Sequence, residues 1–216
     1  DFPEKGIIFR DVTSVLQDAD GLHMAIDQMQ KKLEGVDFDI VLGPESRGFI
    51  FGVPIAYNMH KAFVPVRKKG KLPRATISQT YDLEYGTATI EIHKDAIQPG
   101  QKVVIIDDLI ATGGTIEAAA RLVEELGGEV VKIIFLMELE GLKGREKLKG
   151  YDVSASADIS GYTDASGVSG WAKEAMQWAV GSGLIQGSGN ALTPQANASR
   201  AQIATILMRF AQSIAK

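Results

Sequence analysis

The chain has 216 residues, of which 45% are hydrophobic and 23% are charged, and its formal net charge is -4. These values are typical of a soluble globular protein with one α/β domain, or with one domain and a small module. The acidic balance argues against a nucleic-acid binder with a basic face, and the lack of cysteine excludes disulfides and thiolate metal sites. No apolar run reaches the roughly 20 residues of a membrane-spanning helix. The first residues show no secretory signal, so we expect a cytoplasmic protein that binds neither membrane nor nucleic acid.

The charged residues are distributed unevenly along the chain. Residues 155–216 contain seven of the 50 charged side chains but both tryptophans, and Ala, Ser and Gly account for 28 of these 62 residues. The change in composition predicts a domain at residues 1–154, a linker at 155–161 and a separate helical module at 162–216.

In the first unit, apolar runs rich in β-branched residues alternate with helical patterns. Because these strands are apolar throughout, we expect an α/β fold with a parallel sheet covered by helices on both faces. Helices are predicted at 22–34, at 49–59 with an interruption at Gly52 and Pro54, and at 115–126; strands are predicted at 37–43, 62–68, 87–93, 102–107 and 130–139.

The second unit contains two further helical patterns, at residues 171–185 and 199–214. In the later one, Ile203, Ile206, Leu207 and Phe210 fall on one side, which predicts an amphipathic helix. Ser199 stands where an N-cap residue is expected.

Residues 103–115, VVIIDDLIATGGT, carry the strongest chemical signal. A buried strand brings Asp107 and Asp108 to its C-terminal end, which is the edge where open α/β sheets bind ligands. The next turn is made of small and hydroxylated residues and opens a helix, whose N-terminus favours a phosphate; it consists of Ala111, Thr112, Gly113, Gly114 and Thr115. The two carboxylates could bind the hydroxyls of a sugar, and the turn after them could bind a phosphate. Together they predict a site for a ribose 5-phosphate. An ordinary strand end with a capped loop explains less of this arrangement, and no Walker loop is present.

This segment resembles the phosphoribosyl-diphosphate (PRPP) signature of type I phosphoribosyltransferases. Four further segments, at residues 6–13, 43–52, 64–73 and 81–100, are similar to adenine phosphoribosyltransferases in the same order. The resemblance covers residues 1–153. It implies the type I phosphoribosyltransferase fold, a parallel sheet flanked by helices with a small hood, and a purine-salvage enzyme that makes AMP and pyrophosphate from adenine and PRPP.

The resemblance also implies roles for single residues. Asp107 and Asp108 would contact the ribose hydroxyls, and residues 111–115 would surround the 5-phosphate. Ser46 and Arg47 would bind the diphosphate in a loop that often contains a non-proline cis peptide. The basic residues at the diphosphate, partly across a homodimer interface, would be Arg67, Lys68 and Lys71.

For the base, the resemblance implies a pocket formed by Ile8, Phe9 and Arg10, with Leu109 on the other face of the ring. Within a mobile hood at residues 77–86, Glu84 would act as general acid and Tyr85 would close over the reaction centre. A lid suits a reaction that passes through an oxocarbenium-like cation, because water would intercept that cation. Mg²⁺ would arrive with the diphosphate of PRPP, without a metal site on the protein.

Three alternatives remain at this stage. A phosphoribosyltransferase for another purine such as xanthine would share the fold. A non-catalytic regulator could keep the PRPP pocket as a sensor, although the segments around Glu84 and Phe9 favour an enzyme. A wall-associated fusion protein is the third alternative.

Residues 162–210 resemble an S-layer homology module, a family that binds wall polysaccharide, usually in sets of three. This chain has a single copy, with Gln202 where the family has an acidic residue. We therefore favour a helical appendage that packs on the enzyme or on a second copy over a module that binds wall polysaccharide.

Overall fold

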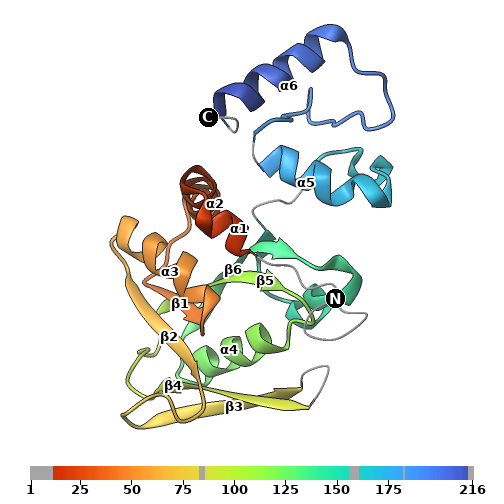
Figure 1. The fold of residues 1–216 in the computed structure, drawn as a ribbon. Coiled ribbons are helices and arrows are strands. Elements are labelled where there is room, and N and C mark those ends of the chain that lie inside the picture. Colours follow the sequence, from red (N-terminus) through yellow and green to blue (C-terminus); the bar gives the residue numbers. More distant parts are fainter. Residues whose placement is uncertain (1–11, 83–85, 156–160, 182, 214–216) are drawn as a thin grey trace.

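The computed structural model describes residues 12–82, 86–155, 161–181 and 183–213. A seven-stranded sheet with the order β3-β4-β2-β1-β5-β6-β7 forms the centre of the first unit (Figure 1). The predicted α/β fold is confirmed. The strands are β1 (Ile40–Pro44), β2 (Ala62–Lys68), β3 (Thr76–Asp82), β4 (Thr87–His93), β5 (Lys102–Ile110), β6 (Glu129–Glu138) and β7 (Val153–Ala155).

The sheet is parallel in its centre and antiparallel at one edge. Strands β2, β1, β5, β6 and β7 run parallel, whereas β3 and β4 form an antiparallel hairpin that joins the sheet through β2. The strand predicted at 87–93 is β4. Its partner β3 lies in the segment predicted only as a hood, because TISQTYD has no continuous apolar run and most of its residues are exposed or half-buried.

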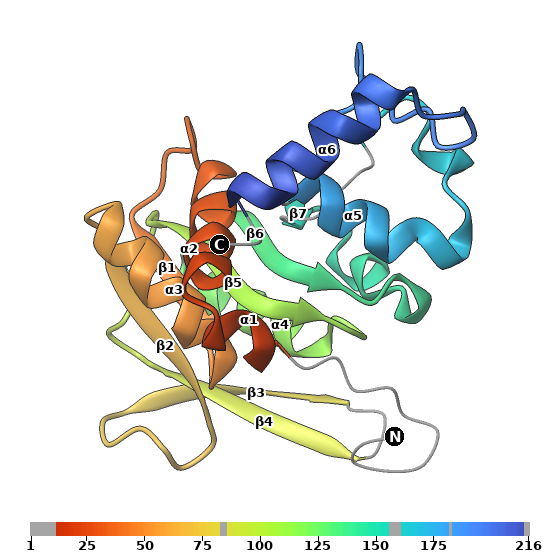
Figure 2. The same cartoon turned by 45° about the horizontal axis from the view of Figure 1, so that its top comes forward.

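Helices cover both faces of the sheet. On one side lie α1 (Thr13–Gln17), α2 (Ala19–Lys31) and α3 (Arg47–Asn58), and on the other lies α4 (Gly114–Glu125) (Figures 1 and 2). Successive residues of β5 point to opposite faces: Ile105 packs in a core with Leu122 of α4, and Val104 packs in a core with Met29 and Phe51. Among the described residues, no helix is long and apolar enough to cross a membrane.

Helix α3 is continuous, so the predicted interruption at Gly52 and Pro54 is wrong. A Cβ at Gly52 would lie 2.7 Å from Cε2 of Phe63. The glycine therefore lets the helix approach β2 closely rather than breaking it. Pro54 removes one helical hydrogen bond, but the flanking Phe51 and Ile55 are fully buried and hold the helix on the sheet.

The second unit is a small helical module with its own core. It comprises the 3₁₀ turns η3 (Ala165–Gly167) and η4 (Gly170–Ala172) and the helices α5 (Lys173–Gly181) and α6 (Arg200–Ser213). Val168 and Leu192 are the buried centre of its core. The two predicted helices are confirmed, although α5 ends at Gly181 before the glycine-rich segment.

Ser199 caps α6 as predicted. Its Oγ accepts a hydrogen bond from the backbone N–H of Gln202 (3.2 Å), and Gln202 Oε1 accepts one from the backbone N–H of Ser199 (2.8 Å). This reciprocal pair is a capping box, in which Gln serves as well as Glu. The residue that departs from the family pattern thus keeps its local structural role.

The apolar side of α6 is largely uncovered in the single chain. Ile203, Leu207, Met208 and Phe210 are all exposed, Leu207 to 61%. Another side of the helix is attached to the segment before it, because Arg209 donates to the carbonyl oxygen of Leu184 (3.1 Å) and to Gln186 Oε1 (3.0 Å).

Candidate functional site

The candidate site lies at one edge of the sheet, where β1 and β5 end side by side. Both strands are parallel neighbours, so the loops that follow them emerge at the same edge. The loop after β1 leads into α3 at Arg47, and the turn after β5 leads into α4 at Gly114. Two segments that were predicted to bind different parts of one substrate are therefore adjacent.

A direct ion pair joins these two segments. Arg47 Nε lies 2.8 Å from Asp108 Oδ2, and the Asp108 side chain is 4% exposed. The distance is short, but the geometry is not that of a hydrogen bond, since Oδ2 has no hydrogen-bond partner. Arg47 thus provides the charge that a buried carboxylate needs.

Gly48 explains how the first turn of α3 comes so close to β5. A Cβ at this position would lie 2.8 Å from Pro44 Cδ, 2.9 Å from the carbonyl oxygen of Ile106 and 3.2 Å from Asp107 Oδ1. Only a glycine fits there without displacing backbone. The sequence motif around Arg47 therefore has a steric basis in the meeting of these two segments.

The two adjacent aspartates differ in their environments. The backbone N–H of Asp108 donates to Asp107 Oδ1 (2.9 Å). Burial of the carboxyl group, and secondly the negative charge of Asp108, raise the pKa of Asp107 well above its ordinary value. The carboxyl group of Asp107 therefore keeps its proton to a higher pH than an isolated aspartate would.

The turn at residues 111–115 forms the start of α4. Gly113 is the N-cap residue, with φ of 80°, a left-handed conformation that glycine adopts without strain. Thr115 Oγ1 donates to the hydroxyl oxygen of Tyr81 on β3 (3.1 Å). Backbone N–H groups at the first turn of a helix are suited to an anion, and the hood strand borders this turn.

The 3₁₀ turn at residues 144–148, which the sequence did not predict, packs against the turn at residues 111–115. In η2 (Gly144–Leu148), the carbonyl oxygen of Gly144 would be 2.5 Å from a Cβ at Gly113. Lys147 Nζ would be 3.9 Å from a Cβ at Gly114, so this lysine brings a positive charge to the turn. The GREK stretch resembles an ordinary charged surface, and the only signal for it is a glycine at a required close approach.

The basic end of β2 contacts the loop after β1 through Glu45. Its Oε2 accepts from Arg67 Nε (2.8 Å) and from the backbone N–H of Lys68 (3.0 Å). The hydrogen bond from Arg67 holds the pKa of Glu45 below its ordinary value. The peptide bond between Glu45 and Ser46 is cis, as the resemblance implied.

The structure brings together most of the residues predicted from the sequence. Leu109 is half-buried beside the aspartates, and the side chains of Lys68 and Lys71 are exposed. Ser46 precedes α3 without a capping hydrogen bond from its side chain. The predicted residues Ile8, Phe9, Arg10, Glu84 and Tyr85 lie outside the described residues.

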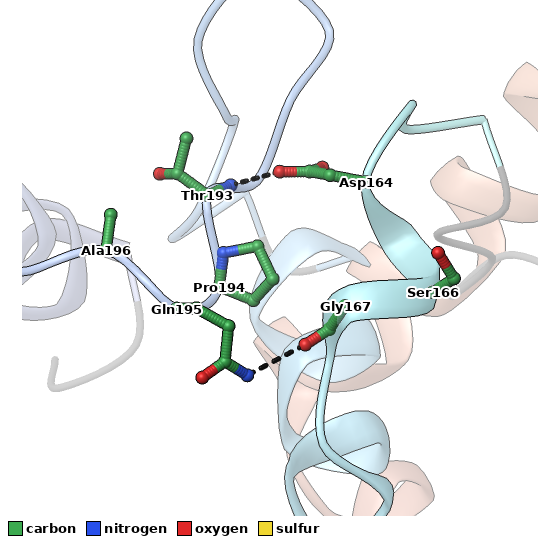
Figure 3. A pocket seen from close by; sticks show the side chains of 7 residues that line it. All are labelled: Asp164, Ser166, Gly167, Thr193, Pro194, Gln195 and Ala196. Carbon is green, nitrogen blue, oxygen red and sulfur yellow. Dashed lines mark hydrogen bonds between the residues drawn. The ribbon is translucent and has the colours of Figure 1, made fainter.

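A separate pocket of about 350 Å³ lies in the helical module, far along the chain from these residues (Figure 3). Asp164 on its wall accepts hydrogen bonds from the backbone N–H groups of Leu192 (2.7 Å) and Thr193 (2.6 Å). Gln195 donates to the carbonyl oxygen of Gly167 (2.9 Å). The carboxylate of Asp164 thus serves the loop structure, and the pocket contains none of the predicted catalytic residues.

Comparison with known proteins supports both units. The phosphoribosyl transferase domain family matches residues 14–168, and the S-layer homology domain family matches residues 161–204. The chain is 78% identical over 148 residues to an adenine phosphoribosyltransferase of Lachnoclostridium phytofermentans, which covers 68% of this chain and 85% of that protein. It is 73% identical, with the same coverage, to an adenine phosphoribosyltransferase of Agathobacter rectalis.

Solved structures give the same answer. The adenine phosphoribosyltransferase of Thermoanaerobacter pseudethanolicus superposes with a TM-score of 0.70 at 59% identity, over 72% of this chain and 90% of that one. The enzyme of Saccharomyces cerevisiae, solved with adenine and an imino-altritol bisphosphate, gives 0.68 at 43% identity, over 71% and 89%. At these identities and coverages, the chain belongs to the adenine phosphoribosyltransferase family.

Proposed function

We propose that the chain transfers the 5-phosphoribosyl group of PRPP to N9 of adenine, giving AMP and pyrophosphate. The bond from N9 to the anomeric carbon forms on the face opposite the leaving group, and the bond from that carbon to the diphosphate oxygen breaks. The electron pair of the broken bond leaves with the diphosphate, and the proton of N9 is released to the solvent. The observation that carries this proposal is the Arg47–Asp108 pair, which joins the proposed diphosphate and ribose segments at one edge.

The 5-phosphate is assigned to the turn from Ala111 to Thr115. The N-terminus of α4 supplies backbone N–H groups and its positive dipole end. Lys147 adds a side-chain charge close to Gly114. An anion bound there would be held by fixed groups that need no rearrangement.

The ribose is assigned to Asp107 and Asp108. A diol presents two hydroxyls, each able to donate and to accept. Asp107 and Asp108 lie near the carboxyl end of β5, where carboxylate oxygens can accept hydrogen bonds from two neighbouring hydroxyls.

The diphosphate is assigned to Ser46, Arg47, Arg67, Lys68 and Lys71. Glu45 holds Arg67 toward the loop that contains Ser46. In a chain of net charge -4, these local cations must provide the attraction for an anionic substrate.

Mg²⁺ is proposed to accompany the diphosphate. Within the described part of the chain, no group of three or more His, Cys, Asp or Glu residues is placed to hold a metal ion. The ion can reach the site on the diphosphate, because Mg²⁺ bound to substrate phosphates keeps several water ligands and needs no cage of protein carboxylates. When bound, the ion would neutralise charge on the leaving diphosphate.

The base site is proposed on resemblance, with support from the yeast relative that was solved with adenine. Ile8, Phe9, Arg10 and Leu109 would surround the ring, while Glu84 and Tyr85 would act from the hood. Leu109 directly follows the aspartates and is half-buried, which supports its assignment to the face of the ring.

A PRPP-dependent assay with adenine, hypoxanthine, guanine and xanthine tests the proposal. We expect AMP from adenine at a kcat/KM far above that for the other bases. Preference for xanthine would identify an enzyme for another purine. Pyrophosphate binding without turnover of any base would indicate a PRPP sensor and would refute the proposed activity.

We also propose a cytoplasmic homodimer, because PRPP is an intracellular metabolite and α3 carries an uncovered apolar stripe. Ile50, Val53 and Tyr57 are exposed on this helix, Tyr57 to 84%, and Arg47 stands at its start. A partner on this stripe would lie close to the site. Light scattering after size-exclusion chromatography would show twice the chain mass, and a monomer at micromolar concentration would refute the dimer.

A further inference from the structure

Two charged side chains are buried in the part of the chain that the structure describes, Asp108 at the site and Glu91 on β4. Asp108 forms an ion pair with Arg47 and belongs to the proposed ribose site. Glu91, in contrast, has no role in the proposed reaction. Ile90 and Ile92, its neighbours on β4, lie in the core beneath the sheet. Glu91 therefore points to the opposite face, where an apolar side chain or an exposed one would be expected.

The cover over Glu91 is the loop that follows the basic end of β2. Glu91 Oε1 accepts three hydrogen bonds from consecutive backbone N–H groups, those of Gly70 (3.0 Å), Lys71 (3.2 Å) and Leu72 (3.2 Å). Gly70 has φ of 82°, which turns the chain so that the three N–H groups converge. Hydrogen bonds to an ionised carboxylate are stronger than neutral ones, so this loop has a fixed place on the sheet.

The basic segment is thereby held at both ends by carboxylates. Glu45 binds the side chain of Arg67 and the backbone of Lys68, and Glu91 binds the backbone on both sides of Lys71. Arg67 and Glu91 are also cross-strand partners. The negative charge under the loop reduces the repulsion among its exposed lysines, Lys68, Lys69 and Lys71.

We propose that Glu91 is a positioning residue for the diphosphate, which holds the loop at residues 70–72 so that Lys71 is presented to the leaving group. This inference rests on the proposed function, in which Lys71 contacts the diphosphate. The proposal explains why a carboxylate is buried at this position of β4. Glu91 itself touches no reacting atom.

The test combines Glu91→Leu, which removes the acceptor at similar size, with Glu91→Gln, which keeps an oxygen but removes the charge. We expect Glu91→Leu to raise the KM for PRPP and the Kd for inorganic pyrophosphate by about tenfold. The KM for adenine should stay the same and kcat should change less than about threefold. Glu91→Gln should raise the Kd for pyrophosphate by about threefold, because a neutral amide oxygen accepts weaker hydrogen bonds than a carboxylate, and this rise tests the inference if Glu91→Leu does not fold.

A double mutant separates positioning from general damage. If Glu91 acts through Lys71, then Glu91→Leu with Lys71→Ala should bind pyrophosphate as weakly as Lys71→Ala alone, within about twofold. Met29→Ala, a truncation in the core on the other side of the sheet, is the stability control. It should lower the melting temperature without changing pyrophosphate affinity.

Calorimetric titration with pyrophosphate measures the Kd directly and does not depend on turnover. An unchanged pyrophosphate Kd in folded Glu91→Leu, or fully additive losses in the double mutant, would overturn the positioning role. A wild-type chain that binds pyrophosphate but makes no nucleotide would refute the proposed activity, while the Glu91 comparison would still be decided by the Kd values.

Discussion

The two units of the chain use their charged and apolar residues in opposite ways. In the sheet unit, apolar side chains fill two continuous cores, and the buried carboxylates of Glu91 and Asp108 each bind defined partners. In the helical module, few charges are present, yet the core centres on Val168 and Leu192 while α6 exposes its apolar side. The low content of charge in the module therefore does not reflect a large core. It reflects a surface on which apolar side chains of α6 are exposed.

The largest expected effect lies in the sheet unit, at the aspartate pair. Asp107→Asn with Asp108→Asn should lower kcat/KM for AMP formation by at least about 100-fold, because the ribose loses two charged acceptors and Arg47 loses its anionic partner. Asp20→Asn with Asp27→Asn, at exposed positions on α2, makes the same change in charge and should leave activity unaltered. Near-normal turnover in the first variant would remove these aspartates from the site.

The second prediction compares two glycines with similar backbones. Gly113 and Gly35 have φ of 80° and 77°, but a Cβ at Gly35 would meet nothing within 4 Å, whereas one at Gly113 would lie 2.5 Å from the Gly144 oxygen. Gly35→Ala should cost about 1 kcal/mol of unfolding free energy. Gly113→Ala should cost about 2–4 kcal/mol, because the clash is added to the backbone strain.

Urea unfolding would measure both losses, and the KM for PRPP should rise in Gly113→Ala alone. Equal losses of stability in the two variants would show that η2 does not support the turn after β5.

The smallest effect is expected in the helical module and depends on pH. Hydrogen bonds from the backbone N–H of Leu192 and then Thr193 hold the pKa of Asp164 below its ordinary value of 3.8. The stabilisation is present above that value and is lost as the pH falls through the lowered pKa of the folded state. Since both tryptophans lie in this module, their fluorescence should change below about pH 4.

Asp164→Asn should loosen the module already at neutral pH, with the kinetics of AMP formation unchanged. An acid transition of tryptophan fluorescence that is identical in Asp164→Asn would assign the pH dependence to other groups.

The fold was predictable from local patterns wherever a strand was apolar throughout or a helix had a clear apolar side. Strand β3 was not, because half-polar hairpin strands lack that signal, and the interruption of α3 was wrongly predicted because Gly52 serves a contact with β2 that lies outside any local window. At the site, the aspartates and the glycine turn stand together in the sequence. Lys147 and Glu91 do not, since their places depend on how distant segments pack.

The antiparallel hairpin of β3 and β4 pairs with the rest of the sheet over only a short stretch of β2. Strands β3 and β4 are joined by seven residue pairs, whereas β4 meets β2 through two, Arg67 with Glu91 and Lys68 with Ile90, and a bond from Lys69 N–H to the Thr89 oxygen. The hairpin also packs on α4, because Ile90 and Ile92 lie in the core shared with this helix and Tyr81 accepts a hydrogen bond from Thr115 Oγ1. Because Arg67 and Glu91 pair at the short junction with β2, a displacement of the hairpin would move the loop that Glu91 holds at residues 70–72, and with it the lysine proposed to meet the diphosphate.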